Sequence, residues 1–304
     1  MNSNDKINKV SVLMTCYNQE KFVNKAIQSI LSQKTNFDFE LLIGEDYSTD
    51  NSLKICENYQ QKYPNIIKII SDHKNIGLSA NQQRLMDAST GEYIAFCEAD
   101  DYWIDEYKLK KQVEFLDSNP NYSSSAHQST VIYDNNNLTH DYRDNVPETI
   151  ETKDLLAKRK FHTASFIFRR NLIDNIDKLP SPLTGWDRAI FLLCSFHGPI
   201  KYFHEPMCVY RKNKIGLTSN VTHKMLLNDL SIIDWLTEIN PAFPKFKYKA
   251  YLYRTIFEYP PKIEIFPLIK YYLLHLVFSF SYFPKNFTDI RISSKRFFKK
   301  LFAS

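Results

Sequence analysis

The sequence predicts an α/β fold in which a mostly parallel sheet is flanked by helices and followed by a helical tail rich in basic and aromatic residues. Between Lys9 and Cys97, short β-branched apolar runs alternate with stretches in which apolar residues recur at helical spacing. That alternation is typical of β–α–β units, which build parallel sheets. After about residue 222 the apolar spacing is helical, interrupted by prolines. We therefore expect two parts, residues 1–220 and residues 221–304.

The elements up to Cys97 follow in a regular order. Apolar runs predict the strands, and apolar residues at i, i+3 and i+4 predict the helices between them. The second helix has candidate N-caps in Ser48 to Asn51 and must end before Pro64, which cannot continue a helix. The predicted strands are 10–15, 39–44, 66–70 and 92–97, and the predicted helices are 19–33, 52–63 and 78–88.

Ligands of parallel sheets bind beyond the carboxyl ends of the strands, so chemistry is expected in the loops that follow the first four strands.

The chain is less regular after Trp103. The elements expected there are a helix over 105–117, an extended stretch near 122–133, a strand over 161–168, a helix over 186–196, and two extended pieces, 199–203 and 206–210.

The composition excludes several classes of protein. Hydrophobic residues make up 43% and charged residues 24% of 304, which suits a buried core and excludes disorder. With 6 glycines and no GxGxxG or GxxxxGK[ST] segment, the two common glycine-rich phosphate loops are excluded. Five cysteines without a CxxC pair indicate buried, reduced thiols. The N-terminus, MNSNDKINK, lacks an apolar stretch, so a cytoplasmic protein without a signal peptide is expected.

The net charge of +5 is unevenly distributed. Residues 241–304 hold 12 of the 39 Lys and Arg, only 3 of the 34 Asp and Glu, and 18 of the 44 aromatic residues. Basic and aromatic residues together indicate an anionic surface, either a membrane interface or nucleic acid. The remaining residues are mildly acidic, which argues against a nucleic-acid groove, so no nucleic acid is expected.

Three acidic clusters follow predicted strands or begin a predicted helix. They are residues 45–50, residues 98–101 and the segment Gly185-Trp186-Asp187. Each could be only an N-cap or a turn, which Asp, Ser and Thr favour. Adjacent carboxylates such as Asp100 and Asp101 repel each other unless a cation intervenes, and Mg²⁺ and Mn²⁺ prefer oxygen ligands. The second cluster therefore predicts a site for a metal and a diphosphate.

Three segments in order carry a resemblance to a known family. They are VSVLMTCYNQEKFVNKAIQSILSQ, FELLIGEDYSTDNS and GEYIAFCEADDYW, and together they cover about 100 residues. The chain resembles the family 2 glycosyltransferases with the GT-A fold, and more weakly so up to about residue 220. The resemblance implies transfer of a sugar from a nucleotide diphosphate sugar to an acceptor hydroxyl, with inversion at the anomeric carbon.

The resemblance also implies which residues bind the nucleotide. Thr15 and Tyr17 match the nucleoside-binding positions, with Tyr17 stacking on or flanking the base. Asp46 matches the acidic residue that accepts a hydrogen bond from the imide N–H of uracil or thymine. Asn81 and Arg84 match, more loosely, a region that lines the nucleotide.

The same resemblance implies the reacting groups. Asp100 matches the position that contacts ribose or metal, Asp101 the ligand of Mn²⁺ or Mg²⁺, and Asp187 the catalytic base. The metal would neutralise the leaving diphosphate, and the base would take the acceptor proton. Glu98-Ala99-Asp100 stands where many relatives have Asp-x-Asp.

The segment VYRKNK (209–214) departs from the family pattern. Asn213 stands where related enzymes have a His that can reach the metal, so the third protein ligand is open, with His223 as a substitute candidate. Arg211, Lys212 and Lys214 could meet the diphosphate or form a solvated loop. The other histidines near apolar runs are expected to be core residues: His127, His162, His197 and His204.

The tail raises the question of a membrane. Residues 264–283 are apolar but contain Pro267, Lys270 and His275, so a helix that packs on the protein or lies in the interface is favoured over a spanning helix. Residues 287–303 predict an amphipathic helix, with a basic surface helix as the alternative. Its apolar side is expected to contain Phe287, Ile290, Phe297, Phe298, Leu301 and Phe302.

The resemblance, together with the tail, implies a metal-dependent hexosyl- or N-acetylhexosaminyl-transferase of cell-surface polysaccharide or glycan assembly. UDP-sugars are the preferred donors because of Asp46, although dTDP presents the same imide edge and GDP stays open. The expected acceptor is a glycan or lipid-linked glycan, with residues 264–303 on an anionic membrane at its inner face. One alternative, supported by Asn213, is a non-catalytic nucleotide-sugar or glycan-binding relative. A nucleotidyltransferase would need a glycine-rich loop after the first strand, and TCYNQEK has no glycine.

Overall fold

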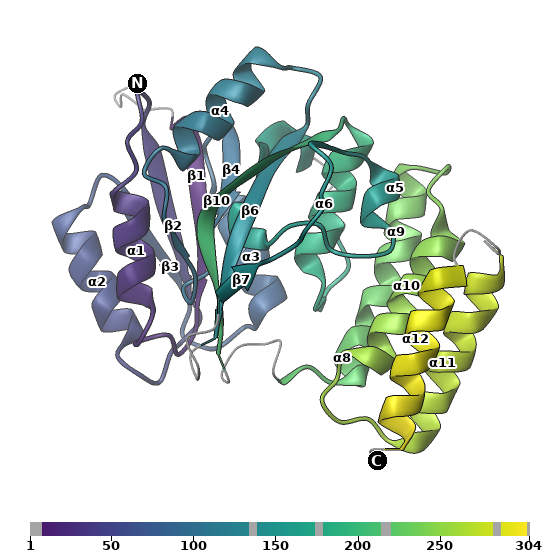
Figure 1. The fold of residues 1–304 in the computed structure, drawn as a ribbon. Coiled ribbons are helices and arrows are strands. Elements are labelled where there is room, and N and C mark those ends of the chain that lie inside the picture. The colour runs from purple at the N-terminus through teal and green to yellow at the C-terminus, as the bar shows by residue number, and fades with distance from the viewer. Residues whose placement is uncertain (1–7, 134–138, 174–178, 214–219, 282–286, 303–304) are drawn as a thin grey trace. The chain divides into compact units, whose positions relative to one another are not determined.

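The computed structural model describes residues 8–133, 139–173, 179–213, 220–281 and 287–302 (Figure 1). Contacts divide the chain into two compact units. The first unit consists of Met1–Glu151, Lys160–Asp177 and Leu193–Lys212, and the second of Thr152–Arg159, Lys178–Leu192 and Asn213–Ser304. The second unit therefore includes two segments, 152–159 and 178–192, that come before residue 220 in the sequence. A division of the sequence at one point, such as residue 220, does not separate the two units.

The first unit begins with the alternating strands and helices that the sequence predicts. Helix α1 begins later than residue 19 because Gln19 starts a turn, in which its carbonyl accepts the N–H groups of Phe22 and Val23 (both 2.9 Å). The elements are β1 (Val10–Cys16), α1 (Val23–Leu31), β2 (Phe39–Glu45), α2 (Ser52–Lys62), β3 (Ile67–Ser71), α3 (Leu78–Ala88) and β4 (Tyr93–Phe96).

Strand β1 lies at the centre of this parallel region. It pairs with β2 on one side and β4 on the other, so that Val12 lies opposite both Leu41 and Ala95. Val10, Val12 and Met14 are fully buried, as are the inward residues of α1. All five cysteines are buried and free, as the sequence predicts. This core fixes the ends of the strands, where the polar loops begin.

The rest of the sheet is mixed. Its strand order is β3-β2-β1-β4-β9-β6-β10-β5, with β7 beside β6 and β8 beside β10. Strand β9 runs antiparallel to β4 and β6, while the long β6–β10 pair is parallel. The predicted α/β class is confirmed. The elements are β5 (Tyr102–Trp103), α4 (Lys108–Ser118), β6 (Ser124–Tyr133), β7 (Thr139–Asp141), β8 (Thr149–Ile150), β9 (Ile167–Arg169), the 3-10 helix η2 (Arg170–Ile173) and β10 (Ile200–Lys212).

Two local predictions differ from the structure. The strand expected over 161–168 is only partly extended, because the 3-10 helix η1 (Thr163–Ser165) precedes β9. His162 caps this helix, since its Nδ1 accepts the N–H of Ala164 at 3.3 Å. The extended pieces 199–203 and 206–210 form one strand, β10, with an irregular register around Pro206, which has no N–H to donate.

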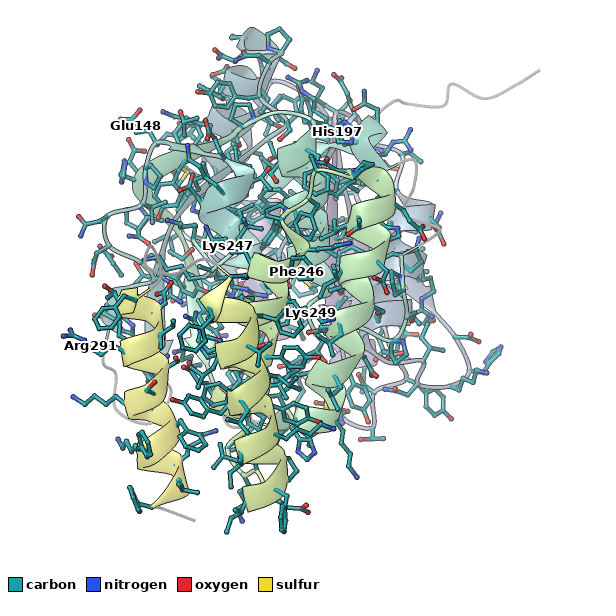
Figure 2. All side chains as sticks on the ribbon, turned by 90° about the vertical axis from the view of Figure 1, so that its right-hand side faces the viewer. Glu148, His197, Phe246, Lys247, Lys249 and Arg291 are labelled. Atoms are coloured by element: carbon teal, nitrogen blue, oxygen red, sulfur yellow. The ribbon has the colours of Figure 1, made fainter. Side chains whose placement is uncertain are left out.

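The second unit is helical. Its helices α10, α11 and α12 lie side by side (Figures 1 and 2). They enclose a core that includes Phe257, Leu268, Tyr271 and Phe297. No helix among the described residues is long and apolar enough to cross a membrane. The elements are α5 (Thr152–Leu155), α6 (Trp186–Phe196, whose last residues belong to the first unit), α8 (His223–Leu227), the 3-10 helix η4 (Asn228–Leu230), α9 (Ser231–Ile239), α10 (Lys245–Glu258), α11 (Ile265–Phe280) and α12 (Phe287–Leu301).

Candidate active site

The carboxyl ends of β1, β2 and β4 meet at one edge of the sheet. The N–H of Asp46, just after β2, donates to the carbonyl of Cys16 at 2.9 Å. The N–H of Ala99, after β4, donates to the carbonyl of Thr15 at 3.2 Å. The loops that carry the predicted site residues of the first unit therefore begin side by side, where open α/β sheets bind their ligands.

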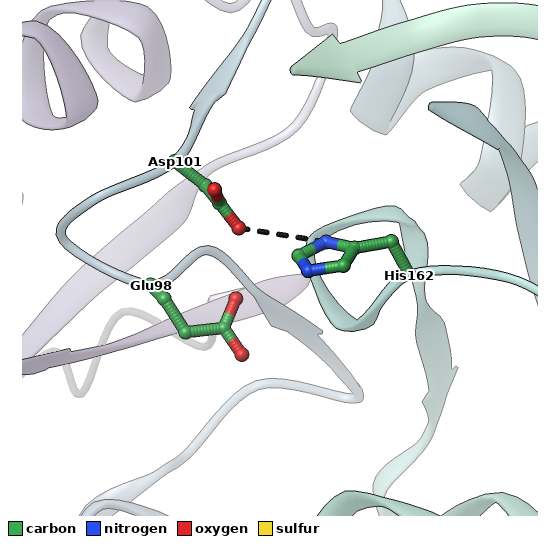
Figure 3. Close-up of side chains that lie close together, drawn as sticks. All are labelled: Glu98, Asp101 and His162. Carbon is green, nitrogen blue, oxygen red and sulfur yellow. Dashed lines mark ion pairs between the residues drawn. The ribbon is translucent and has the colours of Figure 1, made fainter. Parts of the chain in front are cut away.

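Three ligand-type side chains gather at this edge: Glu98, Asp101 and His162 (Figure 3). One ligand atom of each lies within 4.8 Å of the others. Nδ1 of His162 is 3.4 Å from Oδ2 of Asp101, and both residues are buried, at 6% and 2% exposure. The sequence predicts Asp101 as a metal ligand, and the structure adds a carboxylate and an imidazole beside it.

The ring of His162 is held on several sides. It stacks on Tyr210 with ring centroids 4.0 Å apart and an angle of 22° between the planes, and the ring of Tyr142 meets it edge-on at 5.6 Å. Nε1 of Trp103 donates to the carbonyl of Ala164 at 3.0 Å, which anchors η1 directly after His162. The position of the imidazole is therefore set by packing before any ligand binds.

The carboxyl of Asp101 is buried beside two other acidic groups, so its ionised form requires a neighbouring positive charge. Burial raises the pKa of its carboxyl well above the usual range, and the nearby charges of Asp100 and Glu98 raise it further. The N–H of Arg211 opposes this by donating to Oδ1 at 2.8 Å. The Arg211 guanidinium donates to the carbonyl of Asp100 at 2.9 Å. A bound divalent cation would favour the carboxylate form of Asp101 still more.

The donor set fits such a cation. In the neutral imidazole, an Nδ1 that accepts a hydrogen bond carries a lone pair while Nε2 holds the proton. The single lone pair of His162 Nδ1 accepts the N–H of Ala164 at 3.3 Å, so a metal ion would have to replace this bond, and Oδ2 of Asp101 lies 3.4 Å away. Two ligands at right angles on one ion, each about 2.1–2.2 Å from it, lie about 3 Å apart. Side-chain movements that exchange the Ala164 hydrogen bond for a bond to the ion would thus let both residues bind one metal ion.

Asp46 holds the backbone that precedes α3. Its side chain is 3% exposed, and its two oxygens accept the N–H groups of Ile76 at 2.8 Å and Gly77 at 2.9 Å. The amide of Asn75 donates to the Asp46 carbonyl at 2.9 Å. Each carboxylate oxygen has a further lone pair, so a contact with a base stays compatible with this role. Recognition of the base by Asp46 stays a prediction.

Asn81 and Arg84 connect α3 to the end of β2. Asn81 donates to the carbonyl of Gly44 at 2.7 Å, and Arg84 donates to the carbonyl of Glu45 at 3.1 Å and to Oδ1 of Asn81 at 2.7 Å. A Cβ at Gly44 would collide with the Asn81 side chain. Nε and Nη1 of Arg84 are buried without a hydrogen-bond partner in the described residues. These donors could serve a nucleotide.

Tyr17 is exposed on a loop that hydrogen bonds hold in place. Its side chain is 45% exposed. The next residue, Asn18, has a φ of 53°, and its Oδ1 accepts the N–H of Thr49 at 2.8 Å. Gln19 N–H donates to Oγ of Ser52 at 2.7 Å. An exposed aromatic ring on a fixed loop suits stacking against a base, the role predicted for Tyr17.

A small cavity lies beside the cluster. Its lining includes Thr15, Gln82 and Glu98. Gln82 is 7% exposed, and no partner of its Oε1 is found in the described part of the chain.

Asp187 lies in the second unit, in the first turn of α6. Its Oδ2 forms an ion pair with Arg159, and its Oδ1 accepts the N–H of Arg188 at 2.8 Å. Asp229 accepts the N–H groups of Thr184 at 2.8 Å and Gly185 at 3.0 Å. The loop that presents the predicted base is thus fixed by η4, which belongs to the tail.

The sequence interpretation of His162 as a core residue missed its place beside Asp101. The ring is indeed buried, but no spacing in the sequence connects η1 to the loop after β4. His223, the predicted substitute ligand, begins α8 and has Tyr271 as a ring neighbour at 6.2 Å. Lys212 donates to the Tyr133 hydroxyl at 3.2 Å, and Lys214 lies outside the described residues.

The family described as Glycosyl transferase family 2 matches residues 11–176 of the chain, which is more than half of its length. The uncharacterised protein Rv1520 of Mycobacterium tuberculosis is 32% identical over 209 residues, which cover 68% of this chain and 60% of Rv1520. The dTDP-rhamnosyl transferase RfbG of Shigella flexneri is 37% identical over 123 residues, 39% of this chain and 41% of RfbG. The chain thus spans less than two thirds of either relative.

Solved structures share the fold. Residues 1–349 of Staphylococcus aureus TarS, in complex with UDP-GlcNAc, superpose with a TM-score of 0.65 at 18% identity, covering 88% of this chain and 79% of TarS 1–349. The mannosyltransferase PcManGT of Pyrobaculum calidifontis, in complex with GDP-Man and Mn²⁺, gives 0.59 at 17% identity, covering 97% and 87%. The predicted GT-A fold is confirmed. With the family match over residues 11–176, it follows that the chain belongs to glycosyl transferase family 2.

Proposed function

We propose that this glycosyltransferase moves a sugar, with inversion, from a UDP-sugar to a hydroxyl of a glycan acceptor, with the help of a divalent metal ion. The observation that carries the proposal is the group of Glu98, Asp101 and His162 at the edge of the sheet where β1, β2 and β4 end. The match of residues 11–176 to the family supports the reaction class.

Asp101, Glu98 and His162 would hold the metal ion, and Asp100 would contact the ribose or the ion. A bound ion supplies positive charge to the leaving diphosphate. We favour Mn²⁺ over Mg²⁺, because an imidazole nitrogen suits transition metals, whereas Mg²⁺ prefers oxygen ligands and water. PcManGT, which shares the fold, was solved with Mn²⁺. Arg211, against the Asp100 carbonyl, adds a fixed positive charge for the diphosphate.

The nucleoside would lie over the loops after β1 and β2. In the proposed arrangement Tyr17 flanks the base, Thr15 lines the site, and Asp46 accepts the imide N–H. The buried Nε and Nη1 of Arg84, held by Asn81, offer donors to the nucleotide. TarS was solved with UDP-GlcNAc, which is consistent with uracil. The dTDP-rhamnosyl relative keeps thymine as the second choice, since both bases have the same imide edge.

Asp187 would act as the base. A carboxylate within about 3 Å of the acceptor hydroxyl can take its proton as the oxygen attacks. The new bond joins the acceptor oxygen to the anomeric carbon, the bond to the diphosphate oxygen breaks, and the nucleoside diphosphate leaves. A single displacement inverts the anomeric carbon, so no covalent intermediate is needed. The ion pair with Arg159 and the hydrogen bond from Gly185 to Asp229 would hold the Asp187 carboxylate in position.

The acceptor we propose is a glycan or lipid-linked glycan in cell-surface polysaccharide assembly, and the transferred sugar a hexosyl or N-acetylhexosaminyl group. The basic, aromatic tail supports a peripheral place at the inner face of the cell membrane. An acceptor that grows on a lipid is held at a membrane surface, so an enzyme held at the same surface would meet it at a raised local concentration.

The test is a panel of UDP-, dTDP- and GDP-sugars with Mn²⁺, Mg²⁺ or EDTA, read as binding and as slow donor hydrolysis. Wild type is expected to bind a UDP-sugar with Mn²⁺ and to hydrolyse it slowly. Asp101→Ala should lose both, whereas the exposed control Glu57→Ala should keep both. Binding of no donor with either metal would overturn the proposal. Binding without turnover, even with glycan acceptors, would favour the non-catalytic alternative.

A further inference from the structure

Helix α11 is apolar on its exposed side as well as its buried side. Leu268 and Tyr271 face the core of the second unit, while Phe266 is 87%, Leu273 53% and Val277 63% exposed. A helix that is apolar all round is ordinarily buried or in contact with lipid. The exposed apolar residues of α11 are Ile265, Phe266, Ile269, Leu273, Val277 and Phe280.

These residues form a continuous stripe. Ile269, Leu273 and Val277 follow one another at intervals of four, which places them on successive turns of one face. The 16 residues of α11 extend about 24 Å along the helix axis. No described helix is long and apolar enough to cross a membrane, so the stripe suits a helix that lies along a surface.

Helix α12, beside α11, adds aromatic and basic side chains. Its inner side holds Phe297, which stacks on Tyr272 with centroids 3.9 Å apart. Its outer side exposes Phe298 (49%), and Phe302 (83% exposed) follows the last residue of the helix. The predicted apolar side of residues 287–303 is thus divided, because Phe297 is buried in the bundle while its neighbours face outward. Arg291, labelled in Figure 2, points away from the helices.

The exposed charges around the stripe are mostly positive. No carboxylate partner is found, within the part of the chain that the structure describes, for Lys270, Arg291, Lys295 or Lys299. Of the acidic residues on these two helices and their caps, Asp289 lies 3.9 Å from Arg254, and Glu264 caps the start of α11. We call the stripe, Phe298, Phe302 and these four basic residues the tail face.

We propose that the tail face binds the surface of a membrane that contains anionic phospholipids, with the α11 stripe in the acyl boundary and the basic residues at the phosphates. Lys270 can extend from the stripe to the headgroups, as long basic side chains do at interfaces. Each Lys or Arg near an anionic surface strengthens binding about fivefold. The apolar stripe contributes in proportion to the area it buries.

Other occupants fit the tail face less well. Two copies of the chain would bring like charges together across a symmetric interface, which costs free energy. Nucleic acid would pair with the basic residues but leave the apolar stripe in water. An anionic lipid surface offers partners to both the stripe and the charges. The tail face therefore favours a membrane as its partner.

The helices can present this face without rearrangement. His275 of α11 bonds to the Ala250 carbonyl of α10 at 3.0 Å and to Oγ of Ser293 in α12 at 2.8 Å. Lys300 donates to the carbonyls of Phe257 at 3.0 Å and Pro260 at 2.6 Å. These bonds lie on the inner side, so substitutions on the outer side should leave the bundle folded.

The test is flotation of the full chain with vesicles of phosphatidylcholine, alone or with phosphatidylglycerol. Wild type is expected to bind the anionic vesicles at least about tenfold more than the neutral ones, and salt should weaken this binding. Arg291→Glu with Lys295→Glu should lose about 30-fold or more, since two contributions of about 1 kcal/mol are removed. The matched pair Lys54→Glu with Lys62→Glu, exposed on α2, should bind as wild type does.

A second pair of variants tests the stripe. Leu273→Glu should weaken vesicle binding about tenfold or more, whereas Tyr63→Glu, also exposed, should leave it unchanged. Helix content and thermal midpoint are measured for each variant, so that unfolding is recognised. Equal binding to neutral and anionic vesicles, no binding at low salt, or self-association that Leu273→Glu abolishes without vesicle binding would overturn the proposal. Donor binding without vesicles should stay the same, so the proposed catalytic activity is tested separately.

Discussion

Nδ1 of His162 lies 3.4 Å from Oδ2 of Asp101, although the two side chains come from loops that are distant in the sequence. The family resemblance implies a histidine near the metal at the position of Asn213, and this chain lacks it there. His162, which caps η1, would offer a nitrogen ligand in place of that histidine. The tyrosine that stacks on its ring fixes it beside Asp101.

His162→Ala should weaken Mn²⁺ binding by about tenfold or more, because a protein ligand is lost. The readout is direct, by titration of free Mn²⁺ with electron paramagnetic resonance, and needs no substrate. His73→Ala, an exposed histidine before α3, is the control and should bind Mn²⁺ as wild type does. An unchanged Mn²⁺ affinity in His162→Ala would remove His162 from the proposed ligand set.

Asp187→Asn should lower kcat by about 10²- to 10⁴-fold, since the acceptor hydroxyl would lose its base. The amide preserves the shape of the side chain, so the affinity for the donor should change little. Steady-state kinetics and donor binding separate the two effects. A variant that keeps its kcat would show that another group accepts the proton.

Asp229→Asn should flatten the dependence of stability on pH between about 4 and 6. Burial raises the pKa of Asp229 from 3.8 to about 6, although hydrogen bonds from Gly185 and Thr184 oppose the rise. In that range the folded protein binds the proton more tightly than the unfolded chain, so stability falls as pH rises. A shift of about two units corresponds to about 3 kcal/mol.

Urea unfolding of wild type and Asp229→Asn at pH 4.5 and pH 7 measures this slope. The difference in unfolding free energy between the two proteins should change with pH in the direction given. A difference that stays constant over this range would contradict the raised pKa. Asp234→Asn, exposed on α9, is the control and should follow wild type.

His275 should have the opposite effect on the pH dependence of stability from that of Asp229. Burial lowers its pKa from 6.5 to about 4, so the unfolded chain takes up a proton before the folded protein does. Stability should therefore fall as the pH drops from about 6.5 to 4, by up to about 3 kcal/mol. His275→Gln should be less stable than wild type at pH 7.5, because bonds to Ala250 and Ser293 change, yet lose less stability at pH 5. A parallel loss in both proteins would contradict the account.

Much of the first unit could be predicted from the sequence, because β1 to β4 and the helices between them have strong apolar periodicity. The place of Asp101 at the carboxyl edge of the sheet could be predicted for the same reason, since its loop directly follows a predicted strand, whereas its role as a metal ligand, which the family resemblance implies, stays a prediction. The place of His162 could not be predicted, because it depends on the stacking of Tyr210 and on the anchoring of η1 by Trp103. Those contacts join segments that no local pattern connects.

The tail shows a second limit of local patterns. Helical spacing predicts α11 and α12, but it does not say which apolar side becomes core. Phe297 and Phe298 are neighbours in one aromatic run, and packing against Tyr272 and Phe257 makes Phe297 the buried one. The role of Asp229 in fixing the loop before Asp187 likewise depends on contacts within the second unit.

The central claim is that a metal ion bound at Asp101 holds the nucleotide diphosphate. Its most direct test is calorimetric titration of UDP into the wild-type protein with Mn²⁺ and with EDTA. We predict binding at least about tenfold tighter with Mn²⁺, as expected when an ion bridges carboxylate and diphosphate, and loss of that gain in Asp101→Asn. Equal affinity for UDP in Mn²⁺ and in EDTA, with Asp101→Asn indistinguishable from wild type, would contradict the claim.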